Sequence, residues 1–106
     1  MDFNEYQSNA VRTAMYPENL EGNFYYTTIG LAGEVGELLN KVKKIARDKK
    51  MPEREDIISE LGDILWYLSQ TAKEFGTDLD EVAQYNVKKL RDRMNRGVIK
   101  GSGDVR

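Results

Sequence analysis

The sequence predicts an all-α protein whose four helices form one domain. Apolar residues recur at helical spacing along most of the chain, strand signals are absent, and there are only two prolines in 106 residues. Two Asp-x-x-Glu sequences, Asp2–Glu5 and Asp78–Glu81, have the form of the capping boxes that open helices. The length suits one domain and is too short for two, so we expect residues 1–106 to fold as a single unit.

The four predicted helices are joined by short links. The first ends in a break at residues 17–22, the second spans about 24–47, the third about 53–75, and the fourth follows Asp78. Each helix should bury the apolar residues that lie three or four positions apart. From the second helix to the fourth, these are Leu31, Val35, Leu38, Val42 and Ile45; Ile57, Leu61, Ile64, Leu68 and Phe75; and Leu79, Val82, Ala83, Leu90 and Met94.

Composition excludes several kinds of site. The chain has no cysteine and no histidine, which rules out disulfides, thiolate or histidine zinc sites, and histidine-based catalysis. No apolar run is long enough to span a membrane, and the N-terminus lacks a signal-peptide pattern. We therefore expect a soluble, cytoplasmic protein that does not bind membranes.

Charge is distributed unevenly along the chain. Residues 84–106 carry seven Lys and Arg against two Asp, a net charge of +5. Because the whole chain has a net charge of −2, the first 83 residues carry −7. With this net charge we expect no stable binding to nucleic acids. An acidic body and a basic C-terminal segment suit a polyphosphate accompanied by its metal ions.

Two similar stretches lie 26 positions apart, at residues 34–39 and 60–65. Each has two acids three positions apart, which places them on one side of a helix, beside its buried stripe. Two such helices side by side bring four carboxylates together, and their repulsion costs stability unless a cation lies among them. Oxygen ligands without nitrogen or sulfur favour Mg²⁺, with Mn²⁺ as the alternative. The four predicted ligands are Glu34, Glu37, Glu60 and Asp63.

Ordinary surface charge is the competing explanation for these acids. Glu37 has Lys41 four residues further on as an ion-pair partner, and Glu60 is then a solvated acid. The second copy of the motif, in the same helical phase, argues against this explanation.

Four helical glycines accompany the acids. We expect Gly30 and Gly33 to allow close helix packing. For Gly36 and Gly62, close packing and room for a metal or phosphate are equally good explanations.

Glu34-x-x-Glu37, 22 further residues and then Glu60-x-x-Asp63 resembles the signature of the MazG-like all-α nucleoside triphosphate pyrophosphohydrolases. That superfamily also includes dimeric dUTPases and phosphoribosyl-ATP pyrophosphatases. The flanking residues, 33–38 and 60–67, are typical of its MazG branch.

The resemblance extends over roughly residues 24–104. Asn86-x-x-Lys89-Leu90-x-x-Arg93 is similar to the family's later helix, and residues 96–104 to the tail of small bacterial and phage-type members. The glycine-rich tail, residues 97–106, is most simply flexible, with a lid over bound nucleotide as the alternative.

The resemblance implies conversion of a nucleoside or deoxynucleoside triphosphate to its monophosphate and pyrophosphate, for house-cleaning or control of nucleotide pools. It implies that Glu34, Glu37, Glu60 and Asp63 hold Mg²⁺ against the triphosphate and that water attacks the α-phosphorus. One glutamate then acts as the base that orients the water. We choose Glu37, with Glu34 as the other catalytic candidate.

The resemblance also implies substrate-binding residues. Lys89 and Arg93 would neutralise the outgoing phosphates, and Asn86 would contact the sugar or a phosphate. Lys41 and Lys44 either assist in binding the substrate or are surface charge. Trp66 and Tyr67 are candidates for stacking on the base, and the alternative for Trp66 is packing against a neighbouring helix or subunit.

Aromatic residues and family resemblance together predict a homo-oligomer. Seven of the ten aromatic residues are a heavy load for a thin four-helix domain: Tyr6, Phe24, Tyr25, Tyr26, Trp66, Tyr67 and Tyr85. Exposed apolar patches usually mark partners. Family members form dimers or tetramers, often with active sites shared between subunits, and we expect a tetramer or a dimer.

Two rival interpretations remain open. One is dUTPase-type activity on the same metal site, and the other is a non-catalytic nucleotide sensor or helical interaction module.

Overall fold

A computed structural model of the chain describes residues 1–16 and 23–105, and the predicted break at 17–22 lies outside them. The described residues form four α-helices, a short 3₁₀ turn and no strand, which confirms the predicted all-α class. The elements are α1 (Phe3–Ala10), η1 (Val11–Thr13), α2 (Asn23–Asp48), α3 (Arg54–Glu74) and α4 (Leu79–Asn95). None of the described helices combines the length and apolarity needed to cross a membrane.

Local sequence determines where the helices begin and end. Asp2 and Asp78 each accept a 2.8 Å hydrogen bond from the backbone N–H three residues further on, as the capping boxes predicted. Gly76 and Gly97 follow α3 and α4 with φ near +77° and +72°. At both ends, backbone N–H groups turn back to carbonyls of the last helical turn, in the Schellman pattern that favours glycine.

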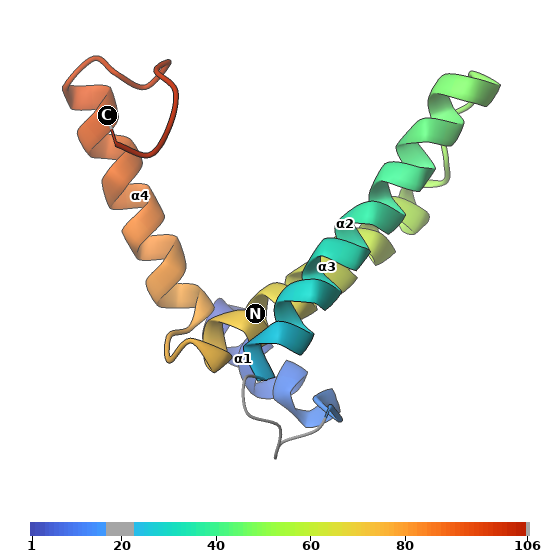
Figure 1. Cartoon of the computed structure of the whole chain (residues 1–106), viewed down its shortest axis with the longest axis horizontal. Coiled ribbons are helices and arrows are strands. Elements are labelled where there is room, and N and C mark those ends of the chain that lie inside the picture. Colours follow the sequence, from blue (N-terminus) through green and yellow to red (C-terminus); the bar gives the residue numbers. More distant parts are fainter. Residues whose placement is uncertain (17–22, 106) are drawn as a thin grey trace.

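The helices form a V rather than a closed bundle (Figure 1). One arm is the antiparallel pair of α2 and α3, and the other is α4 alone. α1 lies at the base, where it contacts α3 and α4. The radius of gyration is 16.7 Å, against about 13 Å for a compact domain of this length. The single chain is therefore unusually open.

This openness leaves much of the predicted core uncovered. The buried apolar residues in the described chain are Ala10, Tyr16, Ala72 and Leu79. The prediction of fully buried stripes is wrong for the described part of a single chain. Beyond the base of the V, α2 and α3 cover only each other, and most of α4 packs on no other described helix (Figure 1). The stripe residues that are exposed are Val35, Val42, Leu61, Leu68, Phe75, Val82, Leu90 and Met94.

Side-chain hydrogen bonds tie the base of the V together. Gln7 of α1 donates to the Ser69 carbonyl at 3.2 Å and accepts from the Leu79 backbone N–H at 2.6 Å, which joins α3 to the start of α4. The Trp66 indole donates to the Ala10 carbonyl at 3.2 Å and to the Thr13 hydroxyl at 2.9 Å. Trp66 thus packs against α1 and η1, as the structural alternative for this residue predicted.

Gly30 lets α2 approach α3 closely. A Cβ atom at Gly30 would overlap the ring of Tyr67, which confirms the predicted close packing. A Cβ atom at Gly33 would meet nothing within 4 Å, so the same prediction is wrong for Gly33 in the single chain. The surroundings of Gly36 and Gly62 are equally open.

These two glycines give a matched test of the packing. Gly30→Ala is expected to destabilise the protein by about 1–3 kcal/mol, because the Tyr67 ring must move. Gly33→Ala is expected to stabilise it by about 0.5–1 kcal/mol through helix propensity alone. Urea unfolding of both variants measures the difference, and equal effects would contradict the α2–α3 contact described here.

Candidate metal centre

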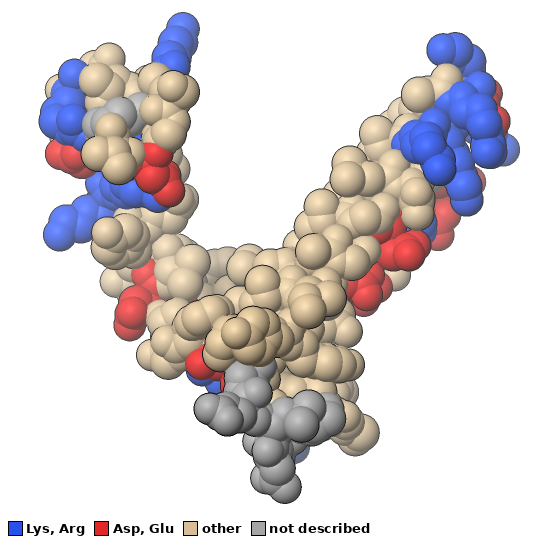
Figure 2. Space-filling view, in the orientation of Figure 1, with Lys and Arg blue, Asp and Glu red and all other residues tan. Residues whose placement is uncertain are grey.

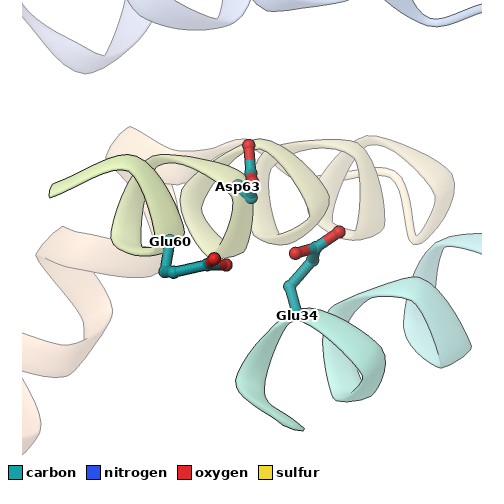
Figure 3. A group of neighbouring side chains, drawn as sticks. All are labelled: Glu34, Glu60 and Asp63. Carbon is teal, nitrogen blue, oxygen red and sulfur yellow. The ribbon is translucent and has the colours of Figure 1, made fainter. Parts of the chain in front are cut away.

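Three carboxylates from the two helices of one arm gather at a single point. Glu34 extends from α2 toward α3, where Glu60 and Asp63 lie about one helical turn apart (Figure 3). One oxygen from each side chain lies within 4.8 Å of the others. Glu34 and Glu60 are half-buried and Asp63 is exposed, so the group borders the helix–helix seam and remains open to solvent.

The antiparallel packing of α2 on α3 creates this arrangement. Residues three apart share one side of a helix, and both motifs have the same phase relative to their apolar stripes. When the stripes pack together, Glu34 therefore meets the corresponding flank of α3. We call Glu34, Glu60 and Asp63 the carboxylate group.

Electrostatic repulsion within the carboxylate group affects Glu34. Partial burial raises the pKa of Glu34, and the charges of Asp63, Glu60 and Glu37 raise it further. A divalent cation among these oxygens would oppose both effects. The donor set consists of carboxylate oxygens alone and fits a hard cation such as Mg²⁺ or Mn²⁺.

Glu37, the fourth predicted ligand, lies outside this group. Its side chain is exposed, although its charge is close enough to raise the pKa of Glu34. Glu37 does not form the ion pair with Lys41 that the surface-charge explanation requires. Lys41 instead forms an ion pair with Glu60 at 3.2 Å across the two helices, and donates to the Asp56 carbonyl at 3.4 Å. Lys41 therefore touches the carboxylate group directly.

Tyrosine side chains border the carboxylate group. Burial, a hydrogen bond with Tyr26 and the charges of Glu34 and Asp63 together raise the pKa of Tyr67. Burial and the charge of Asp63 also raise the pKa of Tyr6. Sequence spacing offered a signal for Tyr67, which lies four residues after Asp63 on the same helical side. Tyr6 carried no such signal, because only the tertiary packing brings it near Asp63.

The predicted substrate-binding residues of α4 lie on the other arm of the V (Figure 1). Asn86 and Lys89 line a shallow groove of about 350 Å³. Arg93 is buried and pairs with Asp104 of the tail. Within the described chain, the structure does not bring these three residues to the carboxylate group.

Positive charge gathers at the far ends of both arms, with acids beside it along the α2–α3 arm (Figure 2). At the end of that arm, residues 41–54 include seven Lys and Arg. Lys41 and Lys44 line a depression of about 350 Å³ there, together with the acids Asp48, Glu53 and Asp56. Because acids balance these lysines, the depression has no strong preference for anions.

Comparisons with known proteins agree with the fold and the acidic motifs. The MazG nucleotide pyrophosphohydrolase domain matches residues 25–98. The chain is 47% identical to "Gene 37 protein" of Mycobacterium phage L5 over an alignment of 110 positions, which covers 95% of this chain and 96% of that protein. No solved structure matches it. The match over most of the chain shows that this protein belongs to the MazG nucleotide pyrophosphohydrolase family.

Proposed function

We propose that the protein hydrolyses nucleoside or deoxynucleoside triphosphates to the monophosphate and pyrophosphate, with Mg²⁺ as its cofactor. The observation that carries this proposal is the carboxylate group, in a chain that belongs to the MazG nucleotide pyrophosphohydrolase family. House-cleaning or control of nucleotide pools in the cytoplasm fits such an activity.

The carboxylate group is the metal-holding part of the proposed site. Glu34, Glu60 and Asp63 offer one oxygen each, and Glu37 on the next turn of α2 is a further ligand candidate. When bound, Mg²⁺ supplies positive charge beside the phosphates and makes nearby water more acidic. Mn²⁺ has the same preference for oxygen and is the expected substitute.

Glu37 is the proposed base. Its exposed carboxylate accepts a proton from the attacking water, with Glu34 as the second candidate for this role. The water oxygen forms a bond to the α-phosphorus, while the bond from that phosphorus to the bridging oxygen breaks. Pyrophosphate leaves with the electron pair of the broken bond.

The α4 arm of a second copy completes the proposed site. Asn86, Lys89 and Arg93 lie on the opposite arm from the carboxylate group (Figure 1), so a neighbouring subunit is the simplest source of the phosphate-binding cations. The many exposed apolar residues on both arms support a homo-oligomer, a tetramer or a dimer. Covering them with another copy would bury the stripes that the single chain leaves open.

Product analysis tests the proposed reaction. Purified protein is incubated with Mg²⁺ and a panel of nucleoside and deoxynucleoside triphosphates, and the monophosphate, diphosphate, pyrophosphate and phosphate are resolved. We expect monophosphate and pyrophosphate only, with both lost in EDTA. Diphosphate and phosphate would place the attack at the γ-phosphorus. Nucleotide binding without turnover would favour a sensor, and a strong preference for dUTP would favour the dUTPase alternative.

A further inference from the structure

The C-terminal tail folds back onto α4 instead of extending from it (Figure 1). After α4 ends at Asn95 and the chain passes Gly97, a turn closes with a 3.1 Å hydrogen bond from the Gly101 N–H to the Val98 carbonyl. The chain then returns along α4 and brings Asp104 to Lys89 and Arg93. We call residues 97–105 the tail.

Asp104 is bound by both of the predicted phosphate-binding cations. Its Oδ1 atom lies 3.2 Å from the Lys89 ammonium and 3.1 Å from Nη2 of Arg93. The same Arg93 nitrogen donates to the Asp104 backbone carbonyl at 2.8 Å. One anionic oxygen therefore lies between two cationic groups, in the position that a phosphate oxygen of a ligand would take.

The folded tail also covers Arg93. Only 5% of the Arg93 side chain is exposed, and no other described helix packs against this half of α4 (Figure 1). Arg93 cannot contact a phosphate while Asp104 is in place. Binding of a ligand phosphate to Arg93 and closure of the tail therefore exclude each other.

Several features make the closed tail easy to displace. The Asp104 side chain is 81% exposed, and solvent-exposed ion pairs contribute little stability. The tail includes Gly97, Gly101 and Gly103, whose backbones adopt many conformations when the tail is open. A triphosphate or pyrophosphate carries more negative charge than one carboxylate and should compete for the same cations.

We propose that Asp104 is an internal substitute for a ligand phosphate and that the tail is a latch. In the free protein the tail closes over Lys89 and Arg93, and the phosphates of a nucleoside triphosphate or of pyrophosphate displace it. The inference deepens the proposed function and rests on it, because it takes Lys89 and Arg93 as the phosphate-binding cations.

Limited proteolysis of the full chain tests closure directly. Trypsin cleaves after Lys100, which lies within the tail, and the cleavage rate reports how much of the tail is open. Asp104→Asn is expected to increase cleavage at this bond by about threefold. Asp92→Asn is the matched control, since it removes a carboxylate that pairs with Arg96 at 2.8 Å on the same helix and leaves the tail contacts intact. Equal rates in both variants would overturn the latch.

Pyrophosphate with Mg²⁺ is the probe for competition. It should speed cleavage after Lys100 in the wild-type protein, and calorimetry should show about threefold tighter binding to Asp104→Asn than to Asp92→Asn. Weaker binding to Asp104→Asn would make Asp104 a positioning residue, and unchanged or absent binding would show that it does not compete with phosphate. Either result overturns the proposal. These readouts need no turnover, so failure of the proposed hydrolysis would be seen separately in the product analysis.

Discussion

Glu60→Gln is expected to reduce Mg²⁺-dependent turnover by more than about a hundredfold, because mutation of even the outer partners of metal ligands typically costs 10–100-fold. The substitution removes one charge from the carboxylate group and keeps the size of the side chain. It also removes the ion pair with Lys41. Two measurements check it, the steady-state kcat/KM and the rise in melting temperature on adding Mg²⁺. Both should be largely lost.

Glu55→Gln is the matched control for this prediction. Glu55 is an exposed acid on the same helix, and it lies outside the carboxylate group. The control should keep both the turnover and the Mg²⁺-dependent rise in melting temperature. If Glu60→Gln behaved like the control, Glu60 would not be a ligand of the proposed metal site.

Glu37→Gln separates the role of a ligand from that of a base. Because Glu37 lies outside the carboxylate group, the variant should retain most of the Mg²⁺-dependent rise in melting temperature. As the proposed base it should still lose about 10²–10⁴-fold in kcat. Loss of the thermal response together with turnover would instead make Glu37 a metal ligand, as the sequence motif predicted.

The helix boundaries and the carboxylate group were predictable because short-range rules determine them. Asp2 and Asp78 cap the helices that follow them, and the spacing of Glu60 and Asp63 places both on one side of α3 whatever the tertiary structure is. The meeting of Glu34 with this pair needed one further assumption, that α2 and α3 pack along their apolar stripes. In the structure α2 does pack against α3, and Glu34 lies beside Glu60 and Asp63.

The partners of the remaining side chains were beyond local rules. A helical wheel shows which side of a helix is apolar and not which element covers it, so it could not show that Leu61 and Met94 are exposed in the single chain. Helical spacing offered Glu37 as the partner of Lys41 in the competing surface-charge explanation, whereas the structure pairs Lys41 with Glu60 across the seam. Asp104 lies in a glycine-rich segment without periodicity, where no pattern indicates a partner.

Mixing Glu60→Gln with Lys89→Ala should restore activity if subunits share the site and each variant alone has lost turnover. Glu60→Gln damages the carboxylate group, and Lys89→Ala removes a cation from the other arm of the V (Figure 1). When equal amounts are unfolded together and refolded, random assembly gives about one quarter of sites an intact carboxylate group and an intact α4. Activity should therefore return to about a quarter of the wild-type value.

The control mixture decides what such recovery means. Glu34 and Glu60 come from α2 and α3 of one arm, so mixing Glu34→Gln with Glu60→Gln leaves every carboxylate group damaged and should restore nothing. If each chain completed its own site, the first mixture would also stay inactive, since each chain carries one lesion. Recovery in the first mixture alone would show that α4 acts on a neighbouring subunit. It would also explain why a chain with its acids and its cations on separate arms needs a second copy for catalysis.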